Sequence, residues 1–192
     1  MDAAAEPDEA LVARYAAGDV AAFEMLYARH ELPLWRYLLR QCGDHGAAEE
    51  LMQEVWFTVT REAPRFRPQG RFTAWLYTLA RHRLIDRHRT THHHRSLDTA
   101  DTADGSTLGE LLADECAPSP LEESQRAEQG EAILAALARL PAEQREAFVL
   151  QAESGMSVEE IATVTGTPFE TAKSRLRYAR DRLKALLRDH AS

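Results

Sequence analysis

Apolar residues recur through this chain at helical spacing, and that periodicity constrains the fold more than any other feature. Near the N-terminus they lie three and four positions apart, as in Phe23, Leu26 and Tyr27. The same stripe returns over residues 46–62 and 71–90. We find no run of alternating β-branched and polar residues between turn signals, which is the pattern typical of strands. The sequence therefore predicts an all-α protein.

Breaks in this periodicity divide the helices into two small domains. Residues 9–90 are predicted to form about four helices, with a kink or a break near Pro33. Residues 91–120 are polar and rich in Thr, Asp, Gly and Ser, so they are predicted to be a flexible acidic linker. Residues 121–189 carry the helical pattern of a second domain.

Charge is distributed unevenly along the chain, and the charges of separate segments lead to a different conclusion about a nucleic-acid partner than the net charge does. A net charge of -8 on 192 residues argues against a nucleic-acid partner, because a phosphate backbone needs a cationic surface. Residues 96–124, however, contain eight acids and no base, and sum to -8 on their own. Residues 71–95 carry +5 and residues 165–192 carry +4. Two basic stretches thus remain on either side of an acidic one.

The second basic stretch has the pattern of a helix-turn-helix. Ser157 and Glu160 fit a capping box, Gly166 ends the short helix that follows, and Thr167 with Glu170 fits a second box. A long basic helix over residues 168–188 would then enter the major groove with its N-terminal part. The alternative is a solvated amphipathic helix at the end of a bundle. The candidate base and phosphate contacts are Thr171, Lys173, Ser174, Arg175 and Arg177.

The first basic stretch, residues 70–89, combines aromatic rings with arginines. Rings can stack on unpaired bases while arginines follow phosphates, a combination that suits single-stranded nucleic acid. The alternative is a core helix with buried aromatics, and we expect Phe72, Trp75 and Leu76 to be buried in that way. The side chains for which we favour a functional role are Arg81, His82, Arg83 and Arg87.

No pattern in the sequence indicates catalysis. Nucleophile-elbow, P-loop and HExxH patterns are absent, so we predict no catalytic residue, no cofactor and no enzyme activity. His92–His94 are consecutive and do not converge well on one ion, so we predict no metal site. Two cysteines are too few for a disulfide framework. With no apolar run of about 18 residues and no signal peptide visible, we predict a cytoplasmic protein without membrane insertion.

Four blocks in order resemble the extracytoplasmic-function (ECF) sigma factors of the sigma-70 family. They read LVARYAAGDVAAFEMLYARH, AAEELMQEVWFTV, FRPQGRFTAWLYTLARHRLIDRHR and, far downstream, a block from LARLPAEQREAF to RLRYARDRLKALL. The resemblance covers about residues 9 to 188 and implies sigma domain 2 over residues 9–90 and sigma domain 4 over residues 121–189.

The resemblance implies binding to core RNA polymerase, through the β′ clamp helices and the β flap, and to promoter DNA. It also implies an anti-sigma factor as a partner, and extrusion of a non-template base into a pocket at the minus-ten reader. The minus-thirty-five element would be read by the basic helix over residues 168–188. The implied contacts are Thr171, Lys173, Ser174, Arg175 and Arg177. The implied docking residues are Glu50, Gln53, Glu54 and Trp56. The implied minus-ten residues are Arg71, Trp75, Arg81, His82, Arg83, Asp86 and Arg87.

This chain departs from the family pattern at two residues. Two other functions are alternatives to that of a sigma factor. Many relatives have Asn where this chain has His82, and Glu170 puts an acid at the start of the recognition helix. A sigma-like protein that only titrates an anti-sigma factor is disfavoured, because both basic stretches keep their Arg and Lys residues. A stand-alone helix-turn-helix regulator is disfavoured by the docking block at residues 49–59.

Overall fold

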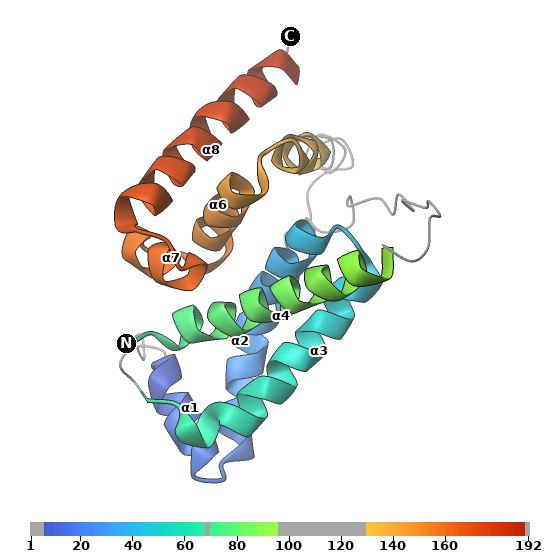
Figure 1. Cartoon of the computed structure of the whole chain (residues 1–192). Helices are drawn as coiled ribbons and strands as arrows, with labels where there is room; N and C mark the ends of the chain where they lie inside the picture. The colour runs from blue at the N-terminus through green and yellow to red at the C-terminus, as the bar shows by residue number, and fades with distance from the viewer. Residues whose placement is uncertain (1–5, 68–69, 96–129, 191–192) are drawn as a thin grey trace, which may run out of the picture.

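The computed structural model describes residues 6–67, 70–95 and 130–190, and these residues form helices without any strand (Figure 1). The predicted all-α fold of two small helical domains is confirmed. The first domain contains α1 (Asp8–Ala16), α2 (Val20–Cys42), α3 (His45–Glu62), the 3-10 turn η1 (Ala63–Arg65) and α4 (Phe72–Arg95). The second contains helical residues 130–138, α6 (Ala142–Ser154), α7 (Val158–Thr165) and α8 (Phe169–His190).

Local signals set the bounds of α2. The Asp19 side chain caps its start by accepting a hydrogen bond from the Ala21 N–H at 3.1 Å. Gly43 ends the helix in a left-handed conformation, with φ of 73°. Pro33 lies inside the helix and does not break it. The packing of buried Leu26 and Leu34 on either side of Pro33 holds the helix together there.

Acidic side chains of α1 fix its position against two other helices. Asp8 accepts hydrogen bonds from Arg29 Nη1 at 2.8 Å and pairs with His30 Nε2 at 2.7 Å. The hydrogen bond with His30 lowers the pKa of the Asp8 carboxyl. Glu9 Oε1 accepts a hydrogen bond from the Phe72 N–H at 2.7 Å, which satisfies a backbone donor at the start of α4. The N-terminal residues of the chain thus help to position α4.

The end of α4 differs from the predicted domain boundary. The helix continues to Arg95, five residues beyond residue 90, where the linker was predicted to begin. It therefore includes His92–His94, whose side chains lie outside the described part of the chain. The rest of the predicted linker, residues 96–120, also lies outside the described residues, as does the start of the predicted second domain, residues 121–129.

Of the two capping boxes predicted in the second domain, one is present and the other is not. The Ser157 capping box is complete, with the Ser157 N–H donating to Glu160 Oε2 at 2.8 Å and the Glu160 N–H donating to Ser157 Oγ at 3.2 Å. The second box is not formed, because α8 begins at Phe169. The Thr167 hydroxyl lies 2.9 Å from that of Thr165 instead.

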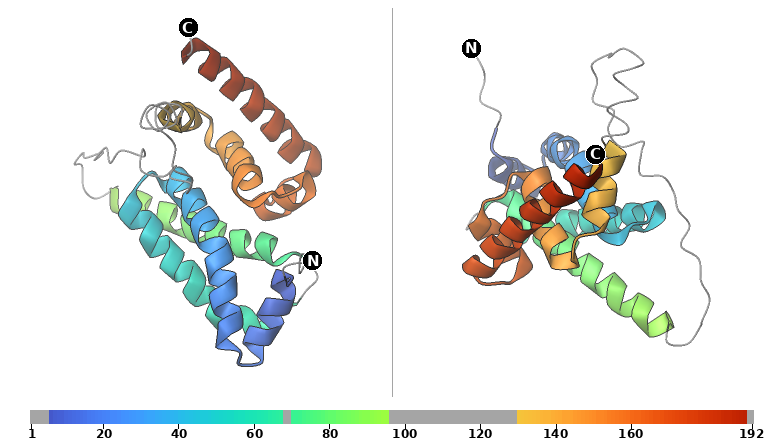
Figure 2. Two further views of the ribbon diagram at one scale, coloured as in Figure 1. Left: turned by 180° about the vertical axis from the view of Figure 1, so that it is seen from behind. Right: turned by 90° about the horizontal axis from the view of Figure 1, so that it is seen from above.

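The two domains pack against each other along two pairs of helices. Helix α6 contacts α2, and α7 contacts α4 (Figures 1 and 2). The buried apolar residues of both domains belong to one continuous cluster. Of the helices described, none has the length and apolar character needed to cross a membrane.

Two leucines on either side of Pro33 test this account of α2. Leu34 is fully buried, whereas Leu32 is 49% exposed. We expect Leu34→Ala to lower the free energy of unfolding by about 2–5 kcal/mol, because it leaves a cavity in the core. Leu32→Ala should change it by no more than about 0.5 kcal/mol. Chemical denaturation of both variants measures the difference, and equal losses would contradict the assigned orientation of the helix.

Candidate nucleic-acid interface

Helix α4 separates an apolar face from a basic one. Phe72, Leu76 and Tyr77 are fully buried, as expected for an amphipathic core helix. Trp75 is half-buried, and its ring lies 5.0 Å from that of Phe66 and 5.8 Å from that of Phe72. The buried face fixes the helix, so the polar side chains on its other faces are presented from a rigid support.

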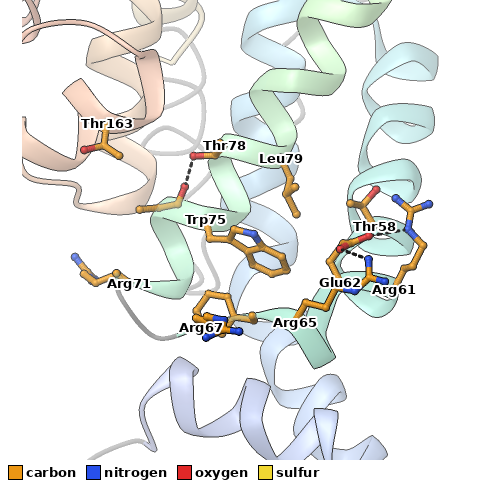
Figure 3. Close-up of a pocket in the computed structure, with 13 residues that line it drawn as sticks. Thr58, Arg61, Glu62, Arg65, Arg67, Arg71, Trp75, Thr78, Leu79 and Thr163 are labelled. Atoms are coloured by element: carbon orange, nitrogen blue, oxygen red, sulfur yellow. Dashed lines mark hydrogen bonds and ion pairs between the residues drawn. The ribbon is translucent and has the colours of Figure 1, made fainter.

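A cavity of about 560 Å³ opens at the N-terminal end of α4 (Figure 3). The indole of Trp75 and the ring of Phe66 supply aromatic surface, and four arginines from the α3 end, η1 and the following loop supply positive charge. Glu62 is the one acid among the lining residues, and the hydrogen bond from Arg61 lowers the pKa of its carboxyl. The polar and aromatic lining residues include Thr58, Arg61, Glu62, Arg65, Phe66, Arg67, Arg71, Trp75, Thr78 and Thr163.

The predicted minus-ten residues do not all gather at this cavity. Arg71 and Trp75 line it. Arg83 and Arg87 lie further along α4 and pair with Glu54 at 3.7 Å and Glu50 at 2.8 Å, respectively. Arg83 Nη2 also donates to Thr58 Oγ1 at 3.0 Å. His82 and Asp86 are exposed.

Arg81 points toward the second domain. Its Nε donates to Glu146 Oε1 of α6 at 2.9 Å. The Tyr37 hydroxyl donates to the same oxygen at 3.4 Å. Burial strongly raises the pKa of the Tyr37 phenol, so that its hydroxyl keeps the proton that it donates. Arg81 is therefore held in an interdomain contact in this structure.

The predicted docking residues on α3 fall into two groups. Glu50, Gln53 and Glu54 are exposed and share one side of the helix. Trp56, predicted as a contact beside them, is only 5% exposed. Its ring packs at 5.0 Å from Tyr27 and 5.6 Å from Phe23. The structure therefore places this indole in the core and away from the exposed side of α3, because an apolar ring on the inner stripe of the helix is stabilised by burial.

The helix-turn-helix consists of α7, a turn at Gly166 and α8. Gly166 has φ of 64°, a left-handed conformation that suits glycine. On α8, Ala172 and Leu176 are buried, which leaves the opposite face for solvent. Lys173 and Arg177 are exposed on that side. The half-buried members of the predicted set are Thr171, Ser174 and Arg175.

Sequence reasoning missed the residues before α4 that complete the cavity. Arg61, Arg65, Phe66 and Arg67 form a basic and aromatic run that continues the pattern of residues 70–89. Pro64 interrupts the helical period there, which is the pattern of a loop and hides the run from a search for helix faces. Within the described residues, no three His, Cys, Asp or Glu side chains gather as a metal site.

A basic, aromatic-lined cavity and a helix-turn-helix lie in one small helical chain, and both features are typical of nucleic-acid-binding proteins. Comparison with known proteins specifies the class. Residues 26–94 match the family Sigma-70 region 2, and residues 130–183 match Sigma-70, region 4. The two matches together show that the chain is an initiation factor of the sigma-70 type.

Full-length relatives narrow the family further. The ECF RNA polymerase sigma factor SigL of Mycobacterium tuberculosis is 33% identical over 184 residues, which cover 94% of this chain and 97% of the relative. RNA polymerase sigma factor CarQ of Myxococcus xanthus is 32% identical, over 91% of this chain and 94% of the relative. The chain belongs to the ECF sigma factors, which are alternative sigma factors of transcription initiation and act as regulatory factors rather than enzymes.

Two solved structures share the fold. The sigma factor RpoE in complex with the anti-sigma factor NepR from Bartonella quintana has a TM-score of 0.70 and 25% identity, over 86% of this chain and 96% of that one. CnrH in complex with the cytosolic domain of CnrY has a TM-score of 0.65 and 25% identity, over 97% of this chain and 100% of that one.

Two residues of α3 that lie three positions apart, Trp56 and Gln53, test the assignment of Trp56 to the core. We expect Trp56→Ala to lower the free energy of unfolding by about 3–5 kcal/mol, because a large buried ring is removed. Gln53→Ala, on the exposed side three residues earlier, should leave stability within about 0.5 kcal/mol of the parent. Thermal and chemical denaturation measure both. A stable Trp56→Ala variant would show that the indole is not part of the core.

Proposed function

We propose that this sigma factor docks on core RNA polymerase through α3, reads and opens the minus-ten region with α4, and reads the minus-thirty-five region with α8. The domains that carry these roles are those predicted over residues 9–90 and 121–189. The observation that carries the proposal is the cavity at the start of α4, which combines the Trp75 ring of α4 with the Phe66 ring and with arginines from the end of α3, η1 and the following loop.

The minus-ten role is supported by the chemistry of that cavity. A base extruded from the duplex needs a ring to stack on, and base–aromatic stacking is worth about 1–3 kcal/mol per base. Trp75 and Phe66 supply such rings, while Arg61, Arg67 and Arg71 supply cations for the phosphates on either side. A volume of about 560 Å³ leaves room for a base in the cavity. Arg81, His82, Arg83, Asp86 and Arg87 would follow the strand along α4.

The minus-thirty-five role rests on the N-terminal half of α8. In a helix-turn-helix, that part of the second helix faces base edges in the major groove. Lys173 is exposed, with Nζ 3.5 Å from Glu170 and 5.7 Å from the centroid of the Phe169 ring. Arg177 is also exposed and lies over the ring of Tyr178. Thr171, Ser174 and Arg175 complete the proposed reader.

Docking on polymerase would use the exposed side of α3 and a second cavity next to it. This cavity, of about 460 Å³, lies between α2 and α3 and includes Gln53. Its lining combines the apolar side chains of Leu32 and Trp35 with Glu31 and Glu49. Such a mixed groove suits an amphipathic helix of a partner, and the clamp helices of the β′ subunit are the proposed occupant. Phe57, 73% exposed, would extend the surface.

An anti-sigma factor is the second proposed protein partner. Of the two structural neighbours described above, RpoE is in complex with the anti-sigma factor NepR and CnrH is in complex with the cytosolic domain of CnrY, and this chain matches nearly the whole length of RpoE and of CnrH. We propose that the same two-domain arrangement accepts a regulator of that kind here.

Replacement of two cations on α8 tests the minus-thirty-five role. We expect Lys173→Ala with Arg175→Ala to abolish promoter-specific transcription by the reconstituted holoenzyme, because contacts to bases and phosphates are lost. Binding to core polymerase should be unchanged. Arg182→Ala with Lys184→Ala, which removes two exposed cations further along the same helix, is the matched control. If core binding fell in parallel with transcription, the assignment of α8 as a DNA reader would be wrong.

Two variants of Trp75 test the stacking role of the cavity. Trp75→Ala should reduce opening of the minus-ten region by about tenfold or more, since loss of a stacking surface is worth about 1–3 kcal/mol. Trp75→Phe should retain part of the activity, because it keeps an aromatic ring. Permanganate reactivity of unpaired thymines in the promoter complex measures opening. Thermal denaturation of both variants controls for folding, and normal opening by a folded Trp75→Ala variant would contradict the proposal.

A further inference from the structure

The contact between the two domains contains three ion pairs in a regular arrangement. Glu146, Glu153 and Glu160 lie seven residues apart on the α6–α7 side. Their three partners all come from the first domain: Arg81 with Glu146, Arg40 with Glu153, and Arg71 with Glu160. The Arg81 pair measures 2.9 Å and the Arg71 pair 3.4 Å.

The three pairs differ in their exposure to solvent. The side chains of Arg40 and Glu153 are 15% and 10% exposed, and Glu146 is 15% exposed. Arg71 is 57% exposed, so its pair with Glu160 lies at the edge of the contact. Shielded pairs are screened less by salt than exposed ones. The contact therefore has two sheltered pairs and one at the rim.

The interdomain contact includes residues of the proposed minus-ten reader and none of the exposed cations of the proposed minus-thirty-five reader. Arg71 and Arg81 belong to the proposed minus-ten reader, and both face carboxylates of the second domain. Thr163 of α7 lines the same cavity as Trp75, so the second domain covers part of its rim (Figure 3). Lys173 and Arg177 on α8 remain exposed.

We propose that these three glutamates form a latch that holds the chain closed before it binds polymerase, with the carboxylates of Glu146 and Glu160 on two arginines that promoter phosphates would contact. A carboxylate and a phosphate offer an arginine the same kind of charged acceptor. The closed state and the DNA-bound state therefore compete for Arg71 and Arg81. This inhibitory role rests on the proposed function of α4, whereas the closed arrangement itself does not.

The closed arrangement can be measured without polymerase or DNA. Spin labels at Ala28→Cys on α2 and Ala185→Cys on α8, two exposed positions, report the distance between the domains in a full chain carrying Cys42→Ser and Cys116→Ser. We expect one narrow distance distribution for this parent. Glu146→Gln, Glu153→Gln and Glu160→Gln together should shift it to longer and broader distances. Gln at position 160 can still complete the Ser157 capping box.

The matched control removes three charges of the same sign elsewhere on the second domain. Glu131→Gln, Glu143→Gln and Glu159→Gln change exposed side chains, and the distance distribution should remain that of the parent. A parent-like distribution in the triple variant of the latch glutamates would overturn the latch, as would an equal shift in the control.

A charge swap at the sheltered pair adds an independent test. Arg40 is outside the proposed DNA readers and the docking surface. Arg40→Glu alone should open the chain, and Arg40→Glu with Glu153→Arg should restore the closed distance. Failure of the double variant to close again would show that the pairing of these charges does not hold the domains together.

The inhibitory role is tested by binding of a single-stranded minus-ten DNA oligonucleotide to the same variants, with the triple control variant matching the change in charge. We expect the triple Gln variant of the latch to bind this strand roughly tenfold more tightly than the control variant, since the fraction of open chain limits the apparent affinity. An opened chain with the affinity of the control variant would refute inhibition while leaving the latch in place. A parent chain that never binds core polymerase would refute the proposed function and leave the distance results standing.

Discussion

The burial of one face of α4 is the constraint on which the rest of this structure depends. Phe72, Leu76 and Tyr77 are fully buried, and the Tyr77 ring meets that of Tyr37 at 5.1 Å in an edge-on contact. Burial raises the pKa of the Tyr77 phenol. Because these side chains fix the rotation of the helix, they also fix the directions of its arginines: toward the cavity, toward α3 and toward the second domain.

Each of these directions brings an arginine to an acid. Arg83 and Arg87 meet glutamates of α3, and Arg71 and Arg81 meet glutamates of the second domain. The proposed minus-ten reader is therefore largely neutralised within the chain itself. An overall acidic protein can carry such a reader without a large exposed basic patch, which lowers its attraction for DNA in general.

Much of the fold could be predicted from sequence because the signals are local. The Ser157 capping box and the glycine turn at Gly166 depend on residues within one turn of each other. Local rules say less where tertiary packing competes with them. Pro33, where a kink or a break was predicted, lies inside a continuous α2, and Trp56 is buried although it lies next to exposed docking residues. The resemblance to sigma factors identified the function, but it could not say which side chains of α3 face inward.

The interdomain ion pairs could not be predicted in this way. Glutamates seven residues apart on the α6–α7 side have the pattern of a solvated helix face, and Arg40 lies in a segment with no functional signal. Only the packing of α6 on α2 and of α7 on α4 brings these charges together. Contacts between residues so far apart in the sequence, 65 positions for Arg81 and Glu146 and 89 for Arg71 and Glu160, leave no trace in local periodicity.

The chemistry of the pairs explains how a closed chain could open at a modest cost. Arg81 has already lost much of its water to the carboxylate of Glu146 and the surrounding helices. Exchange of that carboxylate for a phosphate replaces one charged acceptor with another, so the arginine does not lose its hydration a second time. Lys173 and Arg177 on α8 are exposed and take no part in the latch. A latch on arginines of the minus-ten reader would therefore leave the minus-thirty-five reader available first and make engagement of the minus-ten region depend on separation of the domains.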